Sequence, residues 1–211
     1  MTRLDATRMP ELMSRDRSAL DALLASTIVG HVAYVDETGA PGLLPTAVAR
    51  WGDELVVHGS TGSRWMRLVA GAAAAVSITA VDGVIVARSA FESSLAYRSA
   101  VVFGAFRRLD GDEKLEALDV LTERLLPGRV AEVRRPTKKE LAATLVLAMP
   151  LDEWSLRVSD GWSEDPDDDI ASDAWAGVVR FGARPTSAAV APDVRGGIPM
   201  PPSVTGFRAA H

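Results

Sequence analysis

The chain contains no cysteine and only three histidines, His31, His58 and His211, among its 211 residues. The absence of cysteine excludes disulfides, zinc–thiolate sites, iron–sulfur clusters and a cysteine nucleophile. Three histidines spread along the chain also argue against a multi-histidine metal site. We therefore expect no metal ion held by side chains of this protein.

Positive charge is also in short supply. Lysine and arginine number 23 against 28 acidic residues, which gives a net charge of −5 and an isoelectric point near 5.3. Neutralising nucleic-acid phosphates requires a basic surface, so nucleic acid is not an expected partner. The longest apolar run, 68–81, is shorter than the roughly 20 residues that span a bilayer, and residues 1–17 contain no apolar signal core. We expect a cytoplasmic protein that does not bind membranes.

Short strands dominate the expected secondary structure. Many strands with few intervening helices fit an antiparallel barrel with peripheral helices better than a doubly wound parallel sheet. We expect a flexible arm at 1–15, one domain at 16–180 and an extended Pro/Gly-rich tail at 181–211. The expected strands are 28–35, 42–50, 54–58, 74–80, 83–87, 97–109, 144–149 and 153–158, and the expected helices are 16–24, 64–69, 112–126 and 138–143.

Three local patterns carry specific predictions. Asp82-Gly83 predicts a tight hairpin turn between two strands. Pro45 within a strand predicts an edge strand or a bulge, because proline cannot donate to a sheet ladder. The helix at 112–126 is expected to pack through one stripe of leucines, namely Leu115, Leu118, Leu121 and Leu125.

The segment GSTGSR, residues 59–64, follows an expected strand and opens an expected helix. Glycines that permit close approach, hydroxyl side chains and the Arg64 guanidinium are what an anion site at a helix start requires. The spacing is not that of a Walker loop. An ordinary turn with a Ser or Thr N-cap uses the same residues, and taken alone the segment favours that interpretation.

Several other residues have two possible roles. His58 fits either a ligand contact or a strand-end histidine bonded to backbone, whereas His31 in an apolar strand suits a structural role. Arg88 and Arg98 fit either ligand contacts or anchors for buried carboxylates. The acidic segment 165–169 lacks the glycine and closing glutamate of a calcium loop and is expected to be solvated.

The motifs VDGVIVARSAF, YRSAVVFG, EKLEAL, LLPGR, KKELAAT and WAGVV follow in order after the segment 59–64. In this order the chain resembles the pyridoxamine 5′-phosphate oxidase-related flavin-nucleotide-binding proteins, in the nitroimidazole-resistance-type branch. The resemblance covers about residues 20–179. It implies a split β-barrel, a homodimer, and FMN bound at the dimer interface.

The resemblance also implies a set of cofactor-binding residues. The strand 45–50 is expected to lie along the isoalloxazine ring, mainly through backbone atoms, and the segment 58–64 to surround the phosphate. Trp175 is expected to approach the cofactor, from the partner subunit. The full set is Thr46, Ala47, Val48, Arg50, His58, Gly59, Ser60, Ser63, Arg64, Arg88, Ser89, Tyr97 and Trp175.

The expected function is that of an FMN-dependent oxidoreductase, with NADPH or NADH as electron donor and a small organic acceptor. No catalytic triad or carboxylate pair is recognisable, so catalytic residues stay unassigned, which is consistent with a cofactor that carries the chemistry. The segments FESSLAY, 91–97, and RVS, 157–159, lack the histidines, asparagine and cation common in relatives. Two alternatives are a non-catalytic flavin-binding or interaction protein, and the same fold with a deazaflavin or haem.

Overall fold

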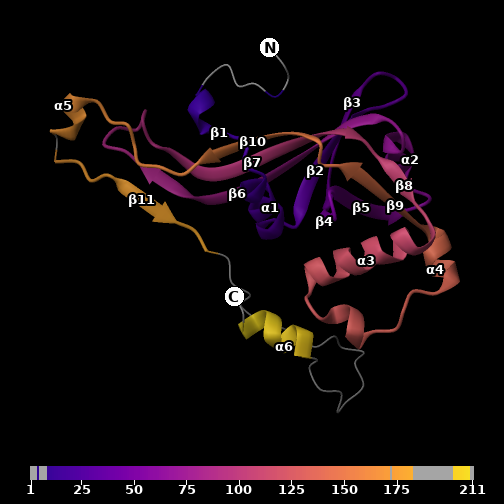
Figure 1. Cartoon of the computed structure of the whole chain (residues 1–211). Coiled ribbons are helices and arrows are strands. Elements are labelled where there is room, and N and C mark those ends of the chain that lie inside the picture. The colour runs from indigo at the N-terminus through magenta and orange to yellow at the C-terminus, as the bar shows by residue number, and fades with distance from the viewer. Residues whose placement is uncertain (1–3, 5–8, 172, 183–201, 210–211) are drawn as a thin grey trace.

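The protein is a split antiparallel β-barrel with helices at its periphery (Figure 1). A computed structural model describes residue 4 and residues 9–171, 173–182 and 202–209. The larger sheet has the strand order β1-β10-β7-β6-β2-β3, and β11 also pairs with β6. The smaller sheet has the order β4-β5-β9-β8. This is the fold class that the sequence predicts.

Helices and strands follow the expected segments closely in the centre of the chain. The strands are β1 (Met13–Ser14), β2 (Val29–Val35), β3 (Pro41–Ala47), β4 (Ala49–Trp51), β5 (Glu54–Ser60), β6 (Ala73–Val86), β7 (Ser94–Ala105), β8 (Arg107–Leu109), β9 (Thr144–Pro150), β10 (Glu153–Ser159) and β11 (Gly177–Arg180). The helices are α1 (Arg17–Ser26), α2 (Arg64–Val69), α3 (Gly111–Leu125), α4 (Lys138–Ala143), α5 (Asp167–Ile170) and α6 (Pro202–Ala209), with 3-10 turns η1 (Pro10–Leu12) and η2 (Arg129–Glu132).

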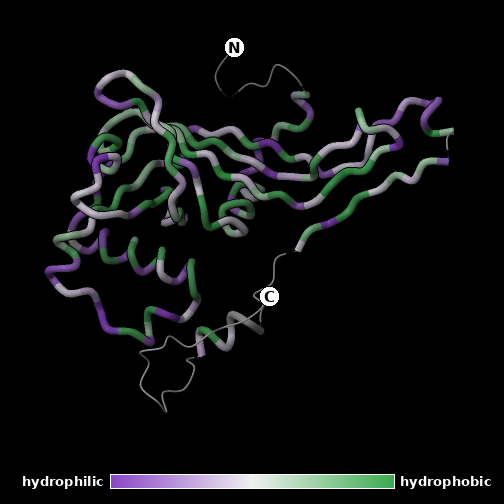
Figure 2. The backbone as a smooth tube through the Cα atoms, turned by 180° about the vertical axis from the view of Figure 1, so that it is seen from behind, coloured by the Kyte–Doolittle hydropathy of each residue, from purple (hydrophilic) through white to green (hydrophobic). Residues whose placement is uncertain are grey.

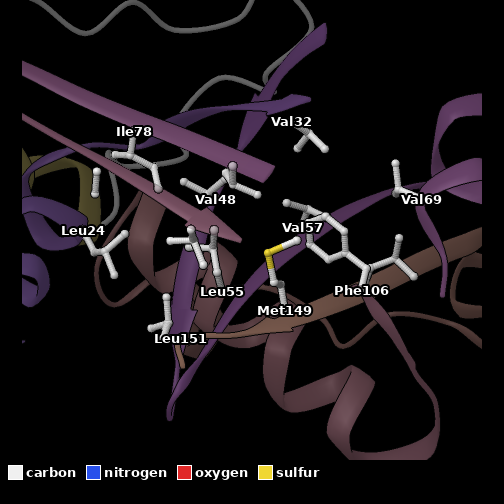
Figure 3. Packing of buried hydrophobic residues seen from close by; sticks show 14 of the residues in the cluster. Leu24, Val32, Val48, Leu55, Val57, Val69, Ile78, Phe106, Met149 and Leu151 are labelled. Carbon is white, nitrogen blue, oxygen red and sulfur yellow. The ribbon is translucent and has the colours of Figure 1, made fainter. Parts of the chain in front are cut away.

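The chain crosses from one sheet to the other at single buried residues. Val48 lies between β3 and β4, is 2% exposed, and donates its backbone N–H to the carbonyl of Ile28 at 2.8 Å. Phe106 occupies the equivalent place between β7 and β8 and is 1% exposed. Figure 3 shows Phe106 packed with Val57 and Met149 between the sheets, so the crossing residues are part of the core.

The predicted hairpin turn at Asp82-Gly83 is wrong. Strand β6 runs through both residues, with only a register shift between Val81 and Gly83 against β7. The glycine serves a different purpose: a Cβ atom on Gly83 would lie 2.4 Å from the carbonyl oxygen of Val179 in β11. Glycine here allows β11 to approach β6, and the bulge bends the strand. The prediction for Pro45 is confirmed, because β3 is an edge strand.

The predicted leucine stripe of α3 is only partly correct. Leu121 is buried, but the other buried residues of the helix are Lys114 and Ala117, and Leu125 is 45% exposed. Small Ala117 lets the helix approach the smaller sheet closely. Leu118 is therefore displaced to the side of the helix, where it is half-buried.

Regular secondary structure is also present at both ends of the expected domain. Within the expected N-terminal arm, β1 pairs with β10. The expected extended tail contains α6, whose Ser203 donates its backbone N–H to the Glu132 carboxylate at 2.8 Å. Asp165 in the acidic segment is buried rather than solvated, because its carboxylate accepts hydrogen bonds from Arg88. In the described part of the chain, no helix is long and apolar enough to cross a membrane.

Strands β6 and β7 extend beyond the barrel as an arm, beside which β11 and α5 lie (Figure 1). Figure 2 shows that hydrophobic segments continue along this arm, away from the core. Val81, Leu95 and Val179 are each about half exposed there. Exposed apolar side chains concentrated on one extended element are typical of a surface that contacts another chain.

Candidate functional site

The loop between β5 and α2 forms a tight turn. The backbone N–H of Ser63 donates to the carbonyl of Ser60 at 2.9 Å, and the N–H of Gly62 donates to the Ser60 hydroxyl at 3.1 Å. Gly59 packs against Met66, from which an added Cβ would lie only 3.1 Å away. Ser63 precedes α2, but its side chain caps no N–H group of the helix. The Ser60 hydroxyl is thus used within the turn, whereas the Ser63 hydroxyl is not used as a cap.

Arg64 is the exposed cation of this loop. Its Nη2 atom lies 2.6 Å from Oε2 of Glu37 and 3.9 Å from Oδ2 of Asp36. The hydrogen bond with Glu37 raises the pKa of the guanidinium, with a smaller contribution from Asp36. Both carboxylates belong to the turn that joins β2 and β3, so Arg64 lies beside the tip of that hairpin.

The residues predicted to lie along a flavin ring are at the opposite end of the same hairpin. Thr46 and Ala47 pair with Gly30 and Val29. Five residues of β3 separate Thr46 from Pro41 at the tip, about 17 Å at the usual rise of a strand. An elongated ligand laid along this hairpin therefore reaches both groups.

Val48 and Arg50 are less available than the sequence predicts. The Val48 side chain is in the core. Arg50 is held by carboxylates and carbonyls of its own chain: Nη1 lies 2.8 Å from Oδ2 of Asp21, and Nε donates to the carbonyl of Gly52 at 2.8 Å. These two residues stabilise the junction between the sheets and α1.

A cavity of about 540 Å³ opens beside the base of the hairpin. Val29, Val81 and Phe181 supply apolar walls. Arg98 lies at its polar side and makes two hydrogen bonds of 2.8 Å with Asp82. That pairing lowers the pKa of Asp82 and raises the pKa of Arg98. Both side chains are therefore charged at neutral pH and fix the shape of the cavity.

The predicted residues at the far end of the arm form a separate group. Arg88 donates through Nη1 to Oδ2 of Asp165 at 2.9 Å, and the Ser89 hydroxyl accepts the N–H of Glu92 at 3.2 Å. Trp175 is 67% exposed and lies over Gly177. Since Gly177 pairs with Val86, this group is located where β6 ends.

Within one chain the two groups are far apart. Eleven residues of β6 separate Val86 from Ala75, which pairs with Ala33 of the hairpin. That length of strand spans about 36 Å. Tyr97 lies between the groups on β7, with its ring 5.9 Å from the Arg157 guanidinium carbon. The structure therefore brings together the hairpin and the loop 59–64, but not Arg88, Ser89 or Trp175.

His58 does not face the phosphate loop. Alternation along β5 puts His58 on the same face as Val56, which packs under α3, whereas Val57 points into the main core. The ring lines a cavity of about 480 Å³ between β5, α3 and α4. The other lining residues are Leu118, Thr122, Val133, Arg134, Pro136, Glu140, Leu141 and Thr144.

The His58 ring has no hydrogen-bond partner among the residues that the structure describes. Its Nδ1 atom is buried and unpartnered, so Nε2 is the nitrogen that is open to the cavity. Burial lowers the pKa of His58. A neutral imidazole with a free lone pair is the form that binds a metal ion.

Lys114 of α3 and Glu37 of the β2–β3 turn make contacts that were not expected from the sequence. Lys114 is buried. Its Nζ donates to the carbonyl of Leu141 in α4 at 2.7 Å and to the carbonyl of Thr144, the residue after α4, at 2.6 Å. Nothing in the sequence around Glu37 distinguishes it from any other carboxylate in a turn, so its ion pair with Arg64 could not be predicted. The burial of Lys114 can be recognised only when it is known which face of α3 packs against the smaller sheet.

The barrel, the hairpin with its cationic loop, and the adjoining cavities define a flavin-type split barrel. The chain belongs to the pyridoxamine 5′-phosphate oxidase family, whose model matches residues 16–158. This family binds flavins, so the predicted class of protein and the predicted fold are confirmed.

Two solved structures are similar to this chain over nearly its whole length. The FAD and haem binding protein of Mycobacterium smegmatis is 52% identical, with a TM-score of 0.89 over 93% of this chain and 97% of that chain. The flavocytochrome Anf3 of Azotobacter vinelandii is 28% identical, with a TM-score of 0.90 over 99% of this chain and 97% of that chain.

A third structure shows the fold alone. It is a putative 5-nitroimidazole antibiotic resistance protein of Bacteroides thetaiotaomicron, which is 15% identical, with a TM-score of 0.58 over 69% of this chain and 86% of that chain. Among curated proteins, none matches the chain.

Proposed function

We propose that this protein is a redox protein that binds FAD and haem and works as a homodimer. The observation that carries the proposal is the unpartnered, neutral His58 ring beside a cavity of about 480 Å³. Cavities of roughly 300–1,000 Å³ hold cofactor-sized ligands. Support comes from the 52% identical FAD and haem binding protein, which aligns over nearly the whole chain.

The flavin half of the proposal concerns the hairpin. Its tip presents Arg64, and its base adjoins the apolar cavity at Val29 and Val81. FAD replaces the FMN expected from the sequence, because both contain the phosphate that Arg64 can pair with, and the 52% identical relative binds FAD. Arg64 and the apolar walls bind and orient the flavin, while Arg98 and Asp82 set the polar side of its pocket.

The haem half concerns the His58 cavity. The cavity combines an imidazole with apolar walls from Leu118, Val133 and Leu141, which suits a flat, largely apolar macrocycle. His58 is the residue that fits the iron. A bound flavin supplies one- and two-electron transfer, and a bound haem supplies one-electron transfer. The protein's share is to hold both groups, exclude water from them and set the distance between them.

Homodimerisation would complete the flavin site. The arm group of Arg88, Ser89 and Trp175 lies about 36 Å from the hairpin of its own chain. The exposed apolar residues of the arm and hairpin, such as Leu95 and Leu43, provide a surface for a second copy. In the proposed dimer, each arm brings these three residues to the hairpin of the other subunit.

The test is a spectrum of purified protein after incubation with FAD, FMN and hemin, followed by anaerobic titration with NADPH and NADH. Paired near-ultraviolet and blue bands together with a Soret band, and bleaching of the flavin by a reduced nicotinamide, are expected. A small organic acceptor should then reoxidise the flavin. Failure to bind either flavin contradicts the flavin half, and absence of a Soret band contradicts the haem half.

A further inference from the structure

We infer that haem occupies the cavity between β5, α3 and α4, with Nε2 of His58 as the axial ligand of the iron and Arg134 as the partner of a haem carboxylate. The inference rests on the haem half of the proposed function. It adds the ligating atom and the residue that orients the macrocycle.

The backbone around His58 fixes the direction of the ring. His58 pairs with Val146 of β9 in a regular antiparallel ladder, so strand alternation determines that its side chain leaves the sheet toward α3. Val56 and Val146 pack on this same face, in the apolar cluster that contains Ala117 and Leu121 of α3. The imidazole is thus attached to a rigid strand, as a ligand to iron must be.

The composition of the chain leaves few imidazole or thiolate ligands for a haem iron. Only His31, His58 and His211 exist, and the chain has no cysteine to serve as a thiolate ligand. His31 is exposed on β2, opposite Pro45 and Ser77, and lines none of the cavities described above. His211 lies outside the described residues. Among the described histidines, only His58 combines a burial-lowered pKa with a free ring nitrogen facing a cavity.

The two sides of the cavity match the two sides of haem. Leu118 of α3 and Leu141 of α4 supply apolar surface for the macrocycle, and Val133 and Pro136 continue it. The polar side is formed by Arg134, in a loop that also contains Arg135 and is followed by Lys138 and Lys139 at the start of α4. Haem is an amphipathic disc with carboxylates along one edge, so its carboxylates face this basic loop.

Arg134 can change partners without leaving the Glu140 carboxylate short of hydrogen-bond donors. It contacts Glu140 through two hydrogen bonds of 2.7 and 2.8 Å. Glu140 also accepts the backbone N–H of Thr137 at 2.7 Å and its hydroxyl at 3.0 Å, in the capping box of α4. When Arg134 turns to a ligand carboxylate, Glu140 therefore keeps two donors and the helix keeps its cap.

The same loop offers a matched control. Arg135 is the next residue, and it is held by Asp119 of α3 at 2.6 and 2.7 Å. It does not line the cavity. Arg134→Gln and Arg135→Gln each remove one cation and one ion pair from the same loop. Only the first should alter how haem is held.

The experiment titrates hemin into the purified full chain and into His58→Gly, His31→Ala, Arg134→Gln and Arg135→Gln. FAD binding and circular dichroism serve as measures of folding for each variant. His58→Gly should lose the Soret band of the wild type and bind hemin at least about tenfold more weakly. Added imidazole should restore the spectrum, because free imidazole replaces the missing ligand. His31→Ala should match the wild type.

Arg134→Gln should keep the wild-type Soret position but release haem to an acceptor apoglobin about two- to fivefold faster, the size expected for a solvent-exposed ion pair. Arg135→Gln should release it at the wild-type rate. If the wild type takes up no hemin, the haem half of the proposed function fails. If the wild type binds hemin and folded His58→Gly gives the same spectrum and affinity, or His31→Ala abolishes both, the inference is overturned while the function stands. Equal release rates for the two arginine variants would overturn the role of Arg134.

Discussion

Arg64 of the loop before α2 and Glu37 of the β2–β3 turn form an ion pair, with 2.6 Å between Nη2 and Oε2. Segments 27 residues apart in sequence are thereby joined at the tip of the hairpin. The cation proposed to bind a flavin phosphate is already neutralised by a carboxylate of its own chain. A phosphate that binds here must compete with Glu37.

This competition gives opposite predictions for the two partners. Arg64→Ala should weaken FAD about tenfold by removing a charged hydrogen bond. Glu37→Gln should strengthen FAD about two- to threefold by removing the competing anion. Riboflavin has no phosphate, so neither change should affect it. Isothermal titration with both ligands decides the matter, and equal losses for FAD and riboflavin in Arg64→Ala would contradict a phosphate contact.

The proposed exchange of arms predicts complementation between variants. Arg64→Ala damages the hairpin group, and Arg88→Gln damages the arm group of the other subunit's site. In an exchanged equal mixture, half of the dimers contain both subunits, and one of the two sites in each is intact. About one quarter of all sites should therefore bind FAD normally. Stoichiometry from flavin absorbance measures this fraction, and a mixture no better than its components would refute shared sites.

The acidity of Glu140 predicts a pH-dependent contribution to stability. Hydrogen bonding by Arg134, with further donors on Thr137, lowers the pKa of Glu140 from 4.5 to about 2. Because the folded pKa is depressed, its contribution is complete above pH 4.5 and is lost as the pH falls toward 2. Glu140→Gln should thus lower the urea midpoint clearly at pH 6 and much less at pH 2, where the carboxyl group is largely protonated in both states. A difference that stays constant over this range would assign the effect to the α4 cap rather than to charge.

Removal of the Lys114 ammonium, which makes two buried hydrogen bonds, should cause a large loss of stability. Its buried ammonium donates to the carbonyls of Leu141 and Thr144, and burial lowers its pKa. Lys114→Met leaves both carbonyls without this donor and should cost about 2–3 kcal/mol in the free energy of unfolding. Exposed Lys139→Met on α4 is the matched control, with an expected change within about 0.5 kcal/mol. Equal urea midpoints for the two variants would show that the buried contact contributes little.

Gly83→Ala should detach β11 from β6. The added methyl group would lie 2.4 Å from the Val179 carbonyl, which is backbone and cannot rotate away. Amide hydrogen exchange at Val179 and at Phe181, whose N–H donates to the carbonyl of Asp82, should accelerate, while exchange at Val76 in the barrel stays slow. Gly161→Ala meets no atom within 4 Å and should leave exchange unchanged. Unaltered protection of β11 in Gly83→Ala would contradict the close approach.

The sequence predicts the fold class and most element centres because strand periodicity and helix signals are local. α4 is predicted to the residue, since its capping box is encoded by Thr137 and Glu140. The prediction of a hairpin turn at Asp82-Gly83 is wrong because the same dipeptide suits both a turn and a strand that another backbone approaches closely. The position of β11, which is distant in sequence, is what distinguishes the strand from the turn at this dipeptide.

The candidate site was also predictable only where it depends on local sequence and not on the packing of distant segments. Arg64 as an exposed cation follows from its local motif, whereas its pairing with Glu37 depends on where the β2–β3 hairpin ends. His58 was grouped with the phosphate loop because it adjoins it in sequence. Strand alternation turns its ring to the opposite face, toward α3, and that consequence requires the register of β5 against β9.

The continuity of β6 limits how this family can change in length. Val76 and Ile78 of this strand lie in the barrel core, while Ile85 is buried in the arm, and the same strand pairs with β2, β7 and β11. Insertion of a single residue between the two parts would turn every later side chain to the opposite face of the sheet. Arms can therefore lengthen or shorten across evolution only in steps of two residues, matched on β7, or through a further bulge like the one at Val81.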